Sequence, residues 1–200
     1  MASGFLAEEC TFSVYTQEHI DSCSSFDCDN KDLNNFFSKD SPLYNTALLG
    51  KTYCFILDND PKTVVCAFTI ANDSIQATLL PGSRKKKIIH YIPRQKHMRN
   101  YPAVLIGRLG VNRNFQGKGL GDELMDFIKS WFIDGNNKTG CRFVVVDSYN
   151  KERPLKYYRD NGFDFVFGSE SQEKEYLSIN SDVPLKTRLM FFDLIFLKNK

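Results

Sequence analysis

The residues with the clearest chemical potential form a glycine-rich hexapeptide, residues 116–121, with the sequence QGKGLG. Glycine adopts backbone conformations that other residues disfavour, and it leaves room for a ligand beside the main chain. A bend of this kind in front of a helix directs several N–H groups at one point, where the helix dipole favours an anion. Gln116 adds a neutral donor and Lys118 a positive charge. The hexapeptide therefore predicts a binding site for a diphosphate group.

Two common nucleotide-binding motifs do not fit this hexapeptide. A nucleotide P-loop requires GxxxxGK[ST], and no Ser or Thr follows Lys118 to hold magnesium. The dinucleotide fingerprint GxGxxG also fails, because the glycines stand at 117, 119 and 121. A nucleotide-dependent enzyme is therefore disfavoured, and a tight glycine turn without a ligand is the alternative interpretation.

The surrounding pattern places this bend between a strand and a helix. Residues 102–111 (PAVLIGRLGV) predict a strand, residues 112–117 a polar turn, and residues 119–132 a helix. The helix has one apolar stripe at offsets typical of a buried face, made of Leu120, Leu124, Phe127, Ile128 and Trp131. Its other face is predicted to hold the polar residues Asp122, Glu123, Asp126 and Lys129.

The remaining elements predict an α/β fold in a single domain spanning residues 1–200. Further strands are expected at residues 11–15, 51–57, 63–70, 142–147, 163–167 and 187–197, with the second and third forming a hairpin. Helices are expected within residues 24–37, where Asp29 or Asn30 can cap the start, between Pro42 and Gly50, and at residues 154–159. The order of these elements implies a parallel crossover, and a polar insertion precedes the last strand.

The positive charge is concentrated in one segment. Residues 84–99 contain seven Lys and Arg and no acid, so the net charge of +2 becomes −5 without them. The segment Arg84–Lys87 is either a solvated loop or a contact for an anion, namely RNA phosphates or the 3′-phosphate of coenzyme A.

Composition excludes several classes of protein. The chain is 42% hydrophobic, which is too apolar for intrinsic disorder, and no window is long and apolar enough to cross a bilayer. The N-terminus lacks the pattern of a secretory signal, so we expect a cytoplasmic protein. Six cysteines and three histidines are dispersed without metal-ligand spacing, which predicts no metal site and reduced, mostly buried thiols.

The hexapeptide resembles the diphosphate signature [RQ]-x-x-G-x-[GA] of the GNAT superfamily of acyl-CoA N-acyltransferases. Leu109, Gly110 and Val111 look like the family's strand that pairs with pantetheine amides, and residues 157–163 (YYRDNGF) look like its YxxxGF ending. The resemblance implies a mixed, mostly antiparallel sheet flanked by helices and splayed between strands near 102–111 and 142–148. It also implies acetyl-CoA as co-substrate and acetyl transfer to a primary amine in a ternary complex.

The resemblance also implies roles for individual residues. Acetyl-CoA is expected at Leu109, Gly110, Val111, Gln116, Gly117, Lys118, Gly119, Leu120, Gly121 and Asn150. Tyr158 is the candidate acid for the departing thiolate, and its alternative role is packing beside Phe163. Asn112 and Asp147 are candidate bases, with a structural role as the alternative for Asp147. Arg108, in an apolar strand, is expected either to pair with a carboxylate or to bind the acceptor.

Residues 25–29 (SFDCD) and 33–37 (LNNFF) resemble the opening of the aminoacyl-tRNA-acetylating toxins within this superfamily. Residues 106–111 and 115–119 resemble their LGRLAV and WQGRG block. Lys151 takes the place of the family's usual Asn, with Asn150 one position away. This likeness implies the amine of an aminoacyl-tRNA as acceptor, an antitoxin partner and a homodimer.

A small-molecule amine acceptor and a non-catalytic module that binds coenzyme A or RNA are the alternatives. Loops at residues 72–101 and 168–186, the second being the insertion, are expected to shape the acceptor site.

Overall fold

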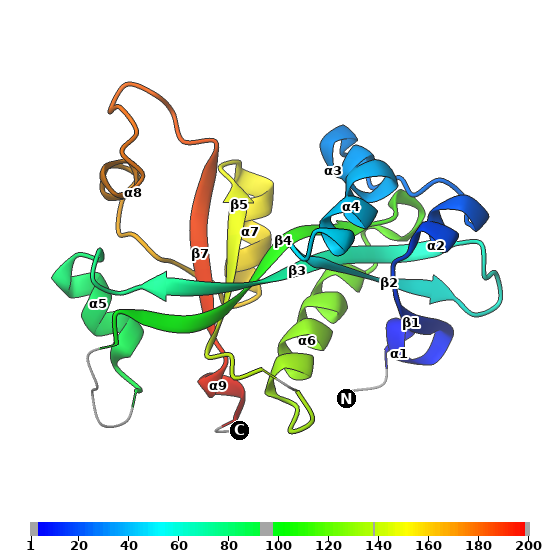
Figure 1. The fold of residues 1–200 in the computed structure, drawn as a ribbon, viewed down its shortest axis with the longest axis horizontal. Helices are drawn as coiled ribbons and strands as arrows, with labels where there is room; N and C mark the ends of the chain where they lie inside the picture. The colour runs from blue at the N-terminus through cyan, green and yellow to red at the C-terminus, as the bar shows by residue number, and fades with distance from the viewer. Residues whose placement is uncertain (1–3, 93–97, 138, 199–200) are drawn as a thin grey trace. The chain divides into compact units, whose positions relative to one another are not determined.

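The chain folds as two units in the computed structural model, which describes residues 4–92, 98–137 and 139–198. Unit 1 contains residues 1–71 and 106–131, and unit 2 contains residues 72–105 and 132–200. Strands β3 (Val64–Gln76) and β4 (Asn100–Val111) each contribute residues to both units. The path of the chain can be followed by colour in Figure 1.

Unit 1 is built on the strand order β1-β2-β3-β4. Strands β1 (Cys10–Val14) and β2 (Lys51–Leu57) pair antiparallel, as do β2 and β3, which confirms the predicted hairpin. The helical elements of this unit are α1 (Phe5–Glu9), α2 (Gln17–Ser22), α3 (Lys31–Asn35), α4 (Ser41–Thr46) and α6, which begins at Leu120 and ends at Ile133.

Side chains alternate between the two faces of this sheet because successive residues of a strand point in opposite directions. On one face, the ring of Phe12 lies 5.1 Å from that of Phe55 and 4.8 Å from that of Phe127 in α6. On the other face, the fully buried Cys54 belongs to a cluster with Phe37. Helices α3 and α4 therefore cover one face of the unit 1 sheet and α6 covers the other (Figure 1).

The predicted cap of the first long helical segment is confirmed. The side chain of Asn30 accepts hydrogen bonds from the backbone N–H groups of Asp32 and Leu33, which start α3. A π-helical turn, Phe36–Asp40, follows directly and buries Phe36 and Phe37. The interval between Pro42 and Gly50 forms α4.

Helix α6 carries the predicted apolar stripe, with one correction. Leu120, Leu124 and Ile128 are buried, as expected. Lys129, predicted on the polar face, is only 5% exposed, and its ammonium lies 3.5 Å from an oxygen of Asp126. The long methylene stem of lysine allows this burial, because it covers apolar surface while the charged end keeps a carboxylate.

Unit 2 is built on the strand order β3-β4-β5-β7-β6. Strands β5 (Phe143–Tyr149) and β7 (Thr187–Asp193) pair antiparallel over their full length, and β6 (Asp164–Phe165) pairs antiparallel with β7. The helices of this unit are α5 (Gly82–Ile89), α7 (Glu152–Asp160), α8 (Glu170–Tyr176) and α9 (Ile195–Lys198). The predicted mixed, mostly antiparallel sheet with flanking helices is confirmed, and the splay between its strands stays a prediction.

The last predicted strand was too long. Strand β7 stops at Asp193, whose side chain accepts a hydrogen bond from the backbone N–H of Ile195 and so begins α9. Asp193 is 5% exposed and pairs with Arg142 at 2.6 Å. The predicted strand at residues 163–167 is likewise reduced to β6.

The polar insertion is ordered by one buried ion pair. Glu173 of α8 is 1% exposed, and its carboxylate lies 2.6 Å from Nε of Arg188 in β7. The same carboxylate accepts a hydrogen bond from the backbone N–H of Leu189. These bonds satisfy a charge that would otherwise be costly to bury, and they fix α8 against β7.

Candidate active site

The glycine-rich bend has the conformation that its sequence predicts. After β4, a 3-10 turn (Arg113–Phe115) leads into Gly117 and Gly119, which have φ angles of +75° and +79°. Residues with a Cβ rarely adopt this left-handed conformation. A Cβ at either glycine would contact no atom within 4 Å, so the space beside the bend is open.

The bend presents a row of free main-chain donors. Among the described residues, the N–H groups of Gly117, Lys118, Gly119 and Leu120 have no hydrogen-bond partner. The next N–H groups, of Asp122 and Glu123, bond to the carbonyl of Gly119 and close the first turn of α6. We call the N–H groups of residues 117–120 the amide cradle. Because it precedes a 14-residue helix, the helix dipole adds to its attraction for an anion.

Gln116 holds the amide cradle in place. Its amide nitrogen donates to the carbonyl of Val111 at 2.9 Å and to the carbonyl of Cys28 at 3.1 Å. Both N–H bonds are therefore made within the protein. The contact of Gln116 with acetyl-CoA stays a prediction, and Lys118 is exposed beside the cradle with its ammonium over the Phe115 ring.

The segment around Cys28 is the support that sequence reasoning did not assign. Asn34 accepts a hydrogen bond from the backbone N–H of Cys28 at 2.9 Å and donates to Asp27 at 2.7 Å. Asp27 also lies 3.1 Å from the guanidinium of Arg113, next to the bend. The hydrogen bond from Asn34 is the main cause that lowers the pKa of the Asp27 carboxyl. The residues conspicuous in the sequence at 25–29 and 33–37 therefore position the amide cradle.

The end of β4 is closely packed against the same segment. A Cβ at Gly110 would lie 3.1 Å from the sulfur of Cys28 and 3.3 Å from the ring of Phe26. Gly110 and Val111 are buried and Leu109 is half-buried. Glycine suits this position because the side chains of Cys28 and Phe26 pack directly against it, and this fixes the strand that leads into the cradle.

Arg108 pairs with no carboxylate among the described residues, which corrects one of its two expected roles. Its guanidinium lies 5.1 Å from the centre of the Phe36 ring, and one terminal nitrogen donates to the carbonyl of Gly107. Its Nε is buried and has no hydrogen-bond partner in the described part of the chain. A cation over an aromatic face is a favourable arrangement that requires no acid.

Tyr158 lies in unit 2, on α7. Its ring packs against Tyr157 and Phe163, with the Phe163 centroid 5.4 Å away, so the predicted packing contact is present. Its hydroxyl has no hydrogen-bond partner among the residues that the structure describes. Burial raises the pKa of Tyr158 to about 12, since the phenolate is poorly solvated there. Tyr158 is therefore protonated at neutral pH and has a free donor.

Asn150, the other expected acetyl-CoA contact in unit 2, is bonded to the insertion. Its amide nitrogen donates to Glu170 and to the carbonyl of Leu185, both at 3.1 Å. Asn112 caps the 3-10 turn and donates to the carbonyl of Val64, so its amide is used structurally. Asp147 is exposed on β5 and interacts with a neighbour.

The other predictions have mixed outcomes. Cys10, Cys28, Cys54 and Cys66 are buried, and all six cysteines are free thiols, as expected. Arg84 and Lys87 are on α5 and bond to residues of β6, while Arg94 and Lys96 lie outside the described residues. No group of His, Cys, Asp and Glu able to hold a metal occurs in residues 4–92, 98–137 and 139–198. Within the same residues, no helix is both long and apolar enough to cross a membrane.

The acetyltransferase (GNAT) domain family matches residues 52–164, which is more than half of the chain and includes the amide cradle and Tyr158. The chain belongs to the GNAT acetyltransferases. This membership confirms the predicted fold class, the acetyltransferase activity and acetyl-CoA as co-substrate.

The proteins similar to this chain include toxins. A tRNA-acetylating toxin of Mycobacterium tuberculosis is 24% identical over 145 residues, covering 72% of this chain and 78% of that protein. The structure of AtaT complexed with acetyl-methionyl-tRNAfMet has a TM-score of 0.65 at 20% identity, covering 96% and 98% of the two chains. AtaTR bound with acetyl-CoA has a TM-score of 0.63 at 18% identity, with 96% and 98% covered. The two structures are similar to this GNAT chain in fold.

Proposed function

We propose that this GNAT acetyltransferase transfers the acetyl group of acetyl-CoA to the α-amino group of an aminoacyl-tRNA. In this proposal the amide cradle binds the diphosphate of acetyl-CoA, and Tyr158 assists the departing thiolate. The observation that carries the proposal is the row of four unpartnered N–H groups at residues 117–120. Acetyl-CoA supplies the activated thioester, and the protein supplies binding, orientation and a proton donor.

The amide cradle fits a diphosphate in charge and in number of donors. A hydrogen bond to a charged group contributes about 1.5–3 kcal/mol, and the dipole of α6 adds to it. Lys118 provides a positive charge at the exposed edge. Bonds to main-chain N–H groups need no side-chain ordering, because Gln116 already holds the bend between Val111 and Cys28. The cradle is therefore preorganised for its anion.

The strand that enters the cradle has a proposed role in orienting the thioester. We assign Leu109, Gly110 and Val111 to main-chain pairing with the pantetheine amides. An N–H group at this strand end would polarise the thioester carbonyl in the manner of an oxyanion hole. The close packing of Gly110 on Cys28 and Phe26 keeps this backbone in place. Asn150 remains a proposed contact for acetyl-CoA through its carbonyl oxygen, because its nitrogen is engaged.

Tyr158 is proposed to donate a hydrogen bond to the sulfur as the C–S bond breaks. A thiol has a pKa of about 8.5, well below the value of about 12 for Tyr158, so full transfer of the phenolic proton is unfavourable. The net proton comes from the amine, which loses one when the amide bond forms. The phenol stabilises the thiolate until that proton arrives, and it stays neutral throughout the physiological pH range.

We infer the class of acceptor from the acidity of its amine. Neither Asn112 nor Asp147 has a geometry that marks it as a base, since the Asn112 amide is bonded in the turn and Asp147 is exposed. An α-amino group has a pKa of about 7.7–8.0, so roughly a tenth of it is neutral at pH 7, whereas a lysine amine at about 10.4 is almost fully charged. An α-amine can lose its proton to water, which favours an aminoacyl ester as acceptor.

The similar proteins support the same acceptor. The curated relative is named a tRNA-acetylating toxin, and the AtaT structure contains acetyl-methionyl-tRNAfMet. We infer that this chain is a growth-inhibiting toxin with an antitoxin partner, acting in the cytoplasm where charged tRNA is present. We also propose that both units form one catalytic domain, because the family match runs through residues of both. A homodimer stays a prediction that sedimentation analysis tests.

The deciding experiment mixes the purified full chain and labelled acetyl-CoA with aminoacyl-tRNA, deacylated tRNA or small primary amines. We expect label only in aminoacyl-tRNA. Tyr158→Phe is expected to lower kcat about 100-fold with little change in the KM for acetyl-CoA. Tyr157→Phe, which removes the neighbouring hydroxyl on the same helix, is the matched control.

Transfer to small amines alone would replace the proposed acceptor, and binding of coenzyme A without any transfer would indicate a non-catalytic module. Equal turnover of Tyr158→Phe and the wild-type protein would exclude Tyr158 as the donor. In cells, expression of the wild-type chain is expected to arrest growth and expression of Tyr158→Phe is not. Harmless expression of an active wild-type enzyme would contradict the toxin assignment.

A further inference from the structure

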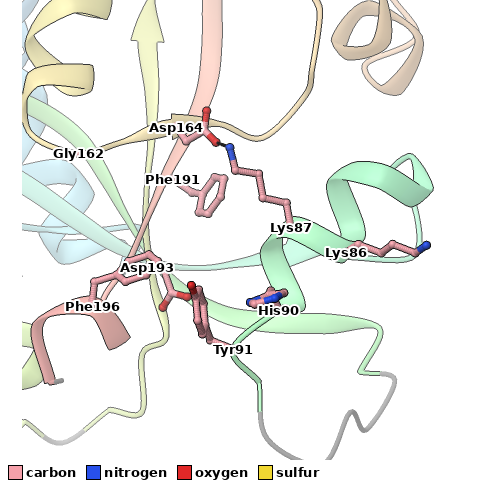
Figure 2. Close-up of a pocket in the computed structure, with 9 residues that line it drawn as sticks. All are labelled: Lys86, Lys87, His90, Tyr91, Gly162, Asp164, Phe191, Asp193 and Phe196. Atoms are coloured by element: carbon pink, nitrogen blue, oxygen red, sulfur yellow. Dashed lines mark hydrogen bonds and ion pairs between the residues drawn. The ribbon is translucent and has the colours of Figure 1, made fainter.

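A pocket of about 450 Å³ lies within unit 2, and none of the residues assigned above to acetyl-CoA lines it (Figure 2). Its walls come from three segments of the chain: the end of α5 with the residues that follow it, the turn after α7 together with β6, and the junction of β7 with α9. Four of its residues, Lys86, Lys87, His90 and Tyr91, lie in the segment 72–101 that the sequence predicted to shape the acceptor site, and the others were not predicted as a site.

Aromatic rings form part of the pocket wall. Phe191 is 7% exposed and forms the inner wall, whereas Tyr91 and Phe196 are 52% and 48% exposed. The centroids of these two exposed rings are 5.3 Å apart at an interplanar angle of 77°. Two large exposed rings in contact, at the edge of a cavity, are typical of a binding surface. They offer π-faces to a flat ligand.

The charged groups of the pocket are paired in a way that leaves acceptors. Asp164 is bonded by Lys87 and lies 3.5 Å from Arg84, and the dashed line in Figure 2 marks the first of these contacts. Asp193 is paired with Arg142 at 2.6 Å. Because each carboxylate already has a cation, the pocket is not a site for a free metal ion or amine. The Asp193 oxygens are taken by Arg142 and by the backbone N–H of Ile195, whereas Asp164 is more exposed and can still accept a hydrogen bond from a neutral N–H donor.

The edge of the pocket is cationic. Lys86 is exposed and extends outward from α5, away from Phe191, and His90 lies beside Tyr91 with ring centroids 4.6 Å apart (Figure 2). Aromatic faces combined with lysine are the combination that binds single-stranded nucleic acid, since bases stack and phosphates meet the cations. An apolar peptide segment would leave these charged groups desolvated without partners.

We infer that this pocket takes one unstacked base of single-stranded RNA, and that it prefers adenine or cytosine. The base stacks on Tyr91 or Phe196, and its exocyclic amino group donates to Asp164, as carboxylates do with cytosine N4. Lys86 neutralises an adjoining phosphate. This inference rests on the proposed function, because the single-stranded end of every tRNA has the sequence CCA.

The fold connects this pocket to the helix that carries Tyr158. Gly162 ends α7 and lines the pocket, with a φ of +81° that lets the chain turn there. A Cβ at position 162 would lie 3.1 Å from the Phe192 ring, so the turn is tightly packed. Phe163 contacts both Tyr158 and Phe192 at centroid distances of 5.4 and 5.7 Å. An RNA base held in the pocket would therefore be fixed to the same rigid turn as α7.

The test measures binding of the full chain to fluorescent RNA tetranucleotides, ACCA and UUUU, by anisotropy at low salt. We expect tighter binding of ACCA, and a loss of tenfold or more in its affinity with Tyr91→Leu or Phe196→Leu. Leucine keeps apolar bulk and removes the ring, so folding is preserved. Tyr44→Leu, an exposed ring of unit 1, is the control and is expected to bind ACCA normally. All variants are expected to retain their affinity for coenzyme A.

Unchanged ACCA binding by both pocket variants would overturn the inference, even if aminoacyl-tRNA is acetylated as proposed. Equal affinity of the wild-type chain for ACCA and UUUU would overturn the assignment of Asp164 to an exocyclic amine. Loss of ACCA binding by the variants would support the pocket, even if aminoacyl-tRNA proved to be the wrong acceptor. The two proposals therefore fail separately.

Discussion

The amide cradle of unit 1 and the aromatic pocket of unit 2 are built from different parts of the chain. The cradle consists of main-chain N–H groups from four consecutive residues, whereas the pocket consists of side chains from three distant segments. Both depend on glycines with positive φ angles, but Gly119 faces open space and Gly162 is packed on Phe192. A substitution in the cradle is thus expected to weaken ligand binding more than folding. A substitution at the turn of the pocket is expected to weaken folding more than ligand binding.

The largest expected effect is that of Gly119→Glu on acetyl-CoA binding. The substitution strains the backbone at a φ of +79° and places a carboxylate beside the diphosphate. Loss of two charge-assisted hydrogen bonds predicts a decrease in affinity of about 100- to 10,000-fold. Isothermal titration calorimetry with coenzyme A measures it. Gly135→Glu, at an exposed glycine with no atom near its Cβ position, should bind normally.

Gly162→Ala tests the aromatic pocket, the second of the two regions compared. The added methyl meets the Phe192 ring at about 3.1 Å and the residue must keep a φ of +81°, which predicts a loss of about 1–2 kcal/mol in the free energy of unfolding. Urea denaturation provides the measurement. Gly82→Ala, with open space around it at the start of α5, should be neutral. A wild-type unfolding free energy for Gly162→Ala would show that the turn adjusts freely.

Gln116→Ala tests whether the amide cradle keeps its conformation without the two side-chain hydrogen bonds of Gln116. Without the two hydrogen bonds to Cys28 and Val111, the bend gains freedom that binding must then remove. We expect about a five- to tenfold loss in coenzyme A affinity, equivalent to about 1 kcal/mol, by calorimetry. Gln76→Ala, at an exposed glutamine of β3, serves as control. If the Gln116 variant binds coenzyme A normally, the bend keeps its conformation without these two hydrogen bonds.

The sequence predicted the cradle because its requirements are local. Left-handed glycines at 117 and 119, a strand before them and an amphipathic helix after them all follow from neighbouring residues. The cap at Asn30 is local in the same way. The hydrogen bond from Gln116 to Cys28 was not predicted, because the carbonyl of Cys28 is 88 positions from Gln116 and every residue has a carbonyl.

The pocket and its surroundings could not be predicted for a related reason. Asp193 interrupts an apolar run in the sequence, and its burial depends on pairing with Arg142, 51 positions away. Arg84 belongs to the basic segment Arg84–Lys87, which the sequence predicted to be either a solvated loop or a contact for an anion. It bonds instead to the backbone carbonyl of Val166. Long-range partners decided both outcomes, and they leave no pattern in the sequence.

The smallest expected effect is that of Lys86→Ala on ACCA binding. Lys86 is solvated, so Lys86→Ala should weaken ACCA binding only about two- to fourfold and should flatten the salt dependence by about 0.7 in the slope of log K against log salt. Lys39→Ala makes the same charge change on the π-helical turn of unit 1 and should leave the slope unchanged. Equal slopes for all three proteins would mean that no phosphate lies at Lys86. Because Lys86 lines the aromatic pocket and is not assigned to the acetyl-CoA site, coenzyme A affinity of Lys86→Ala should match the wild-type value at every salt concentration.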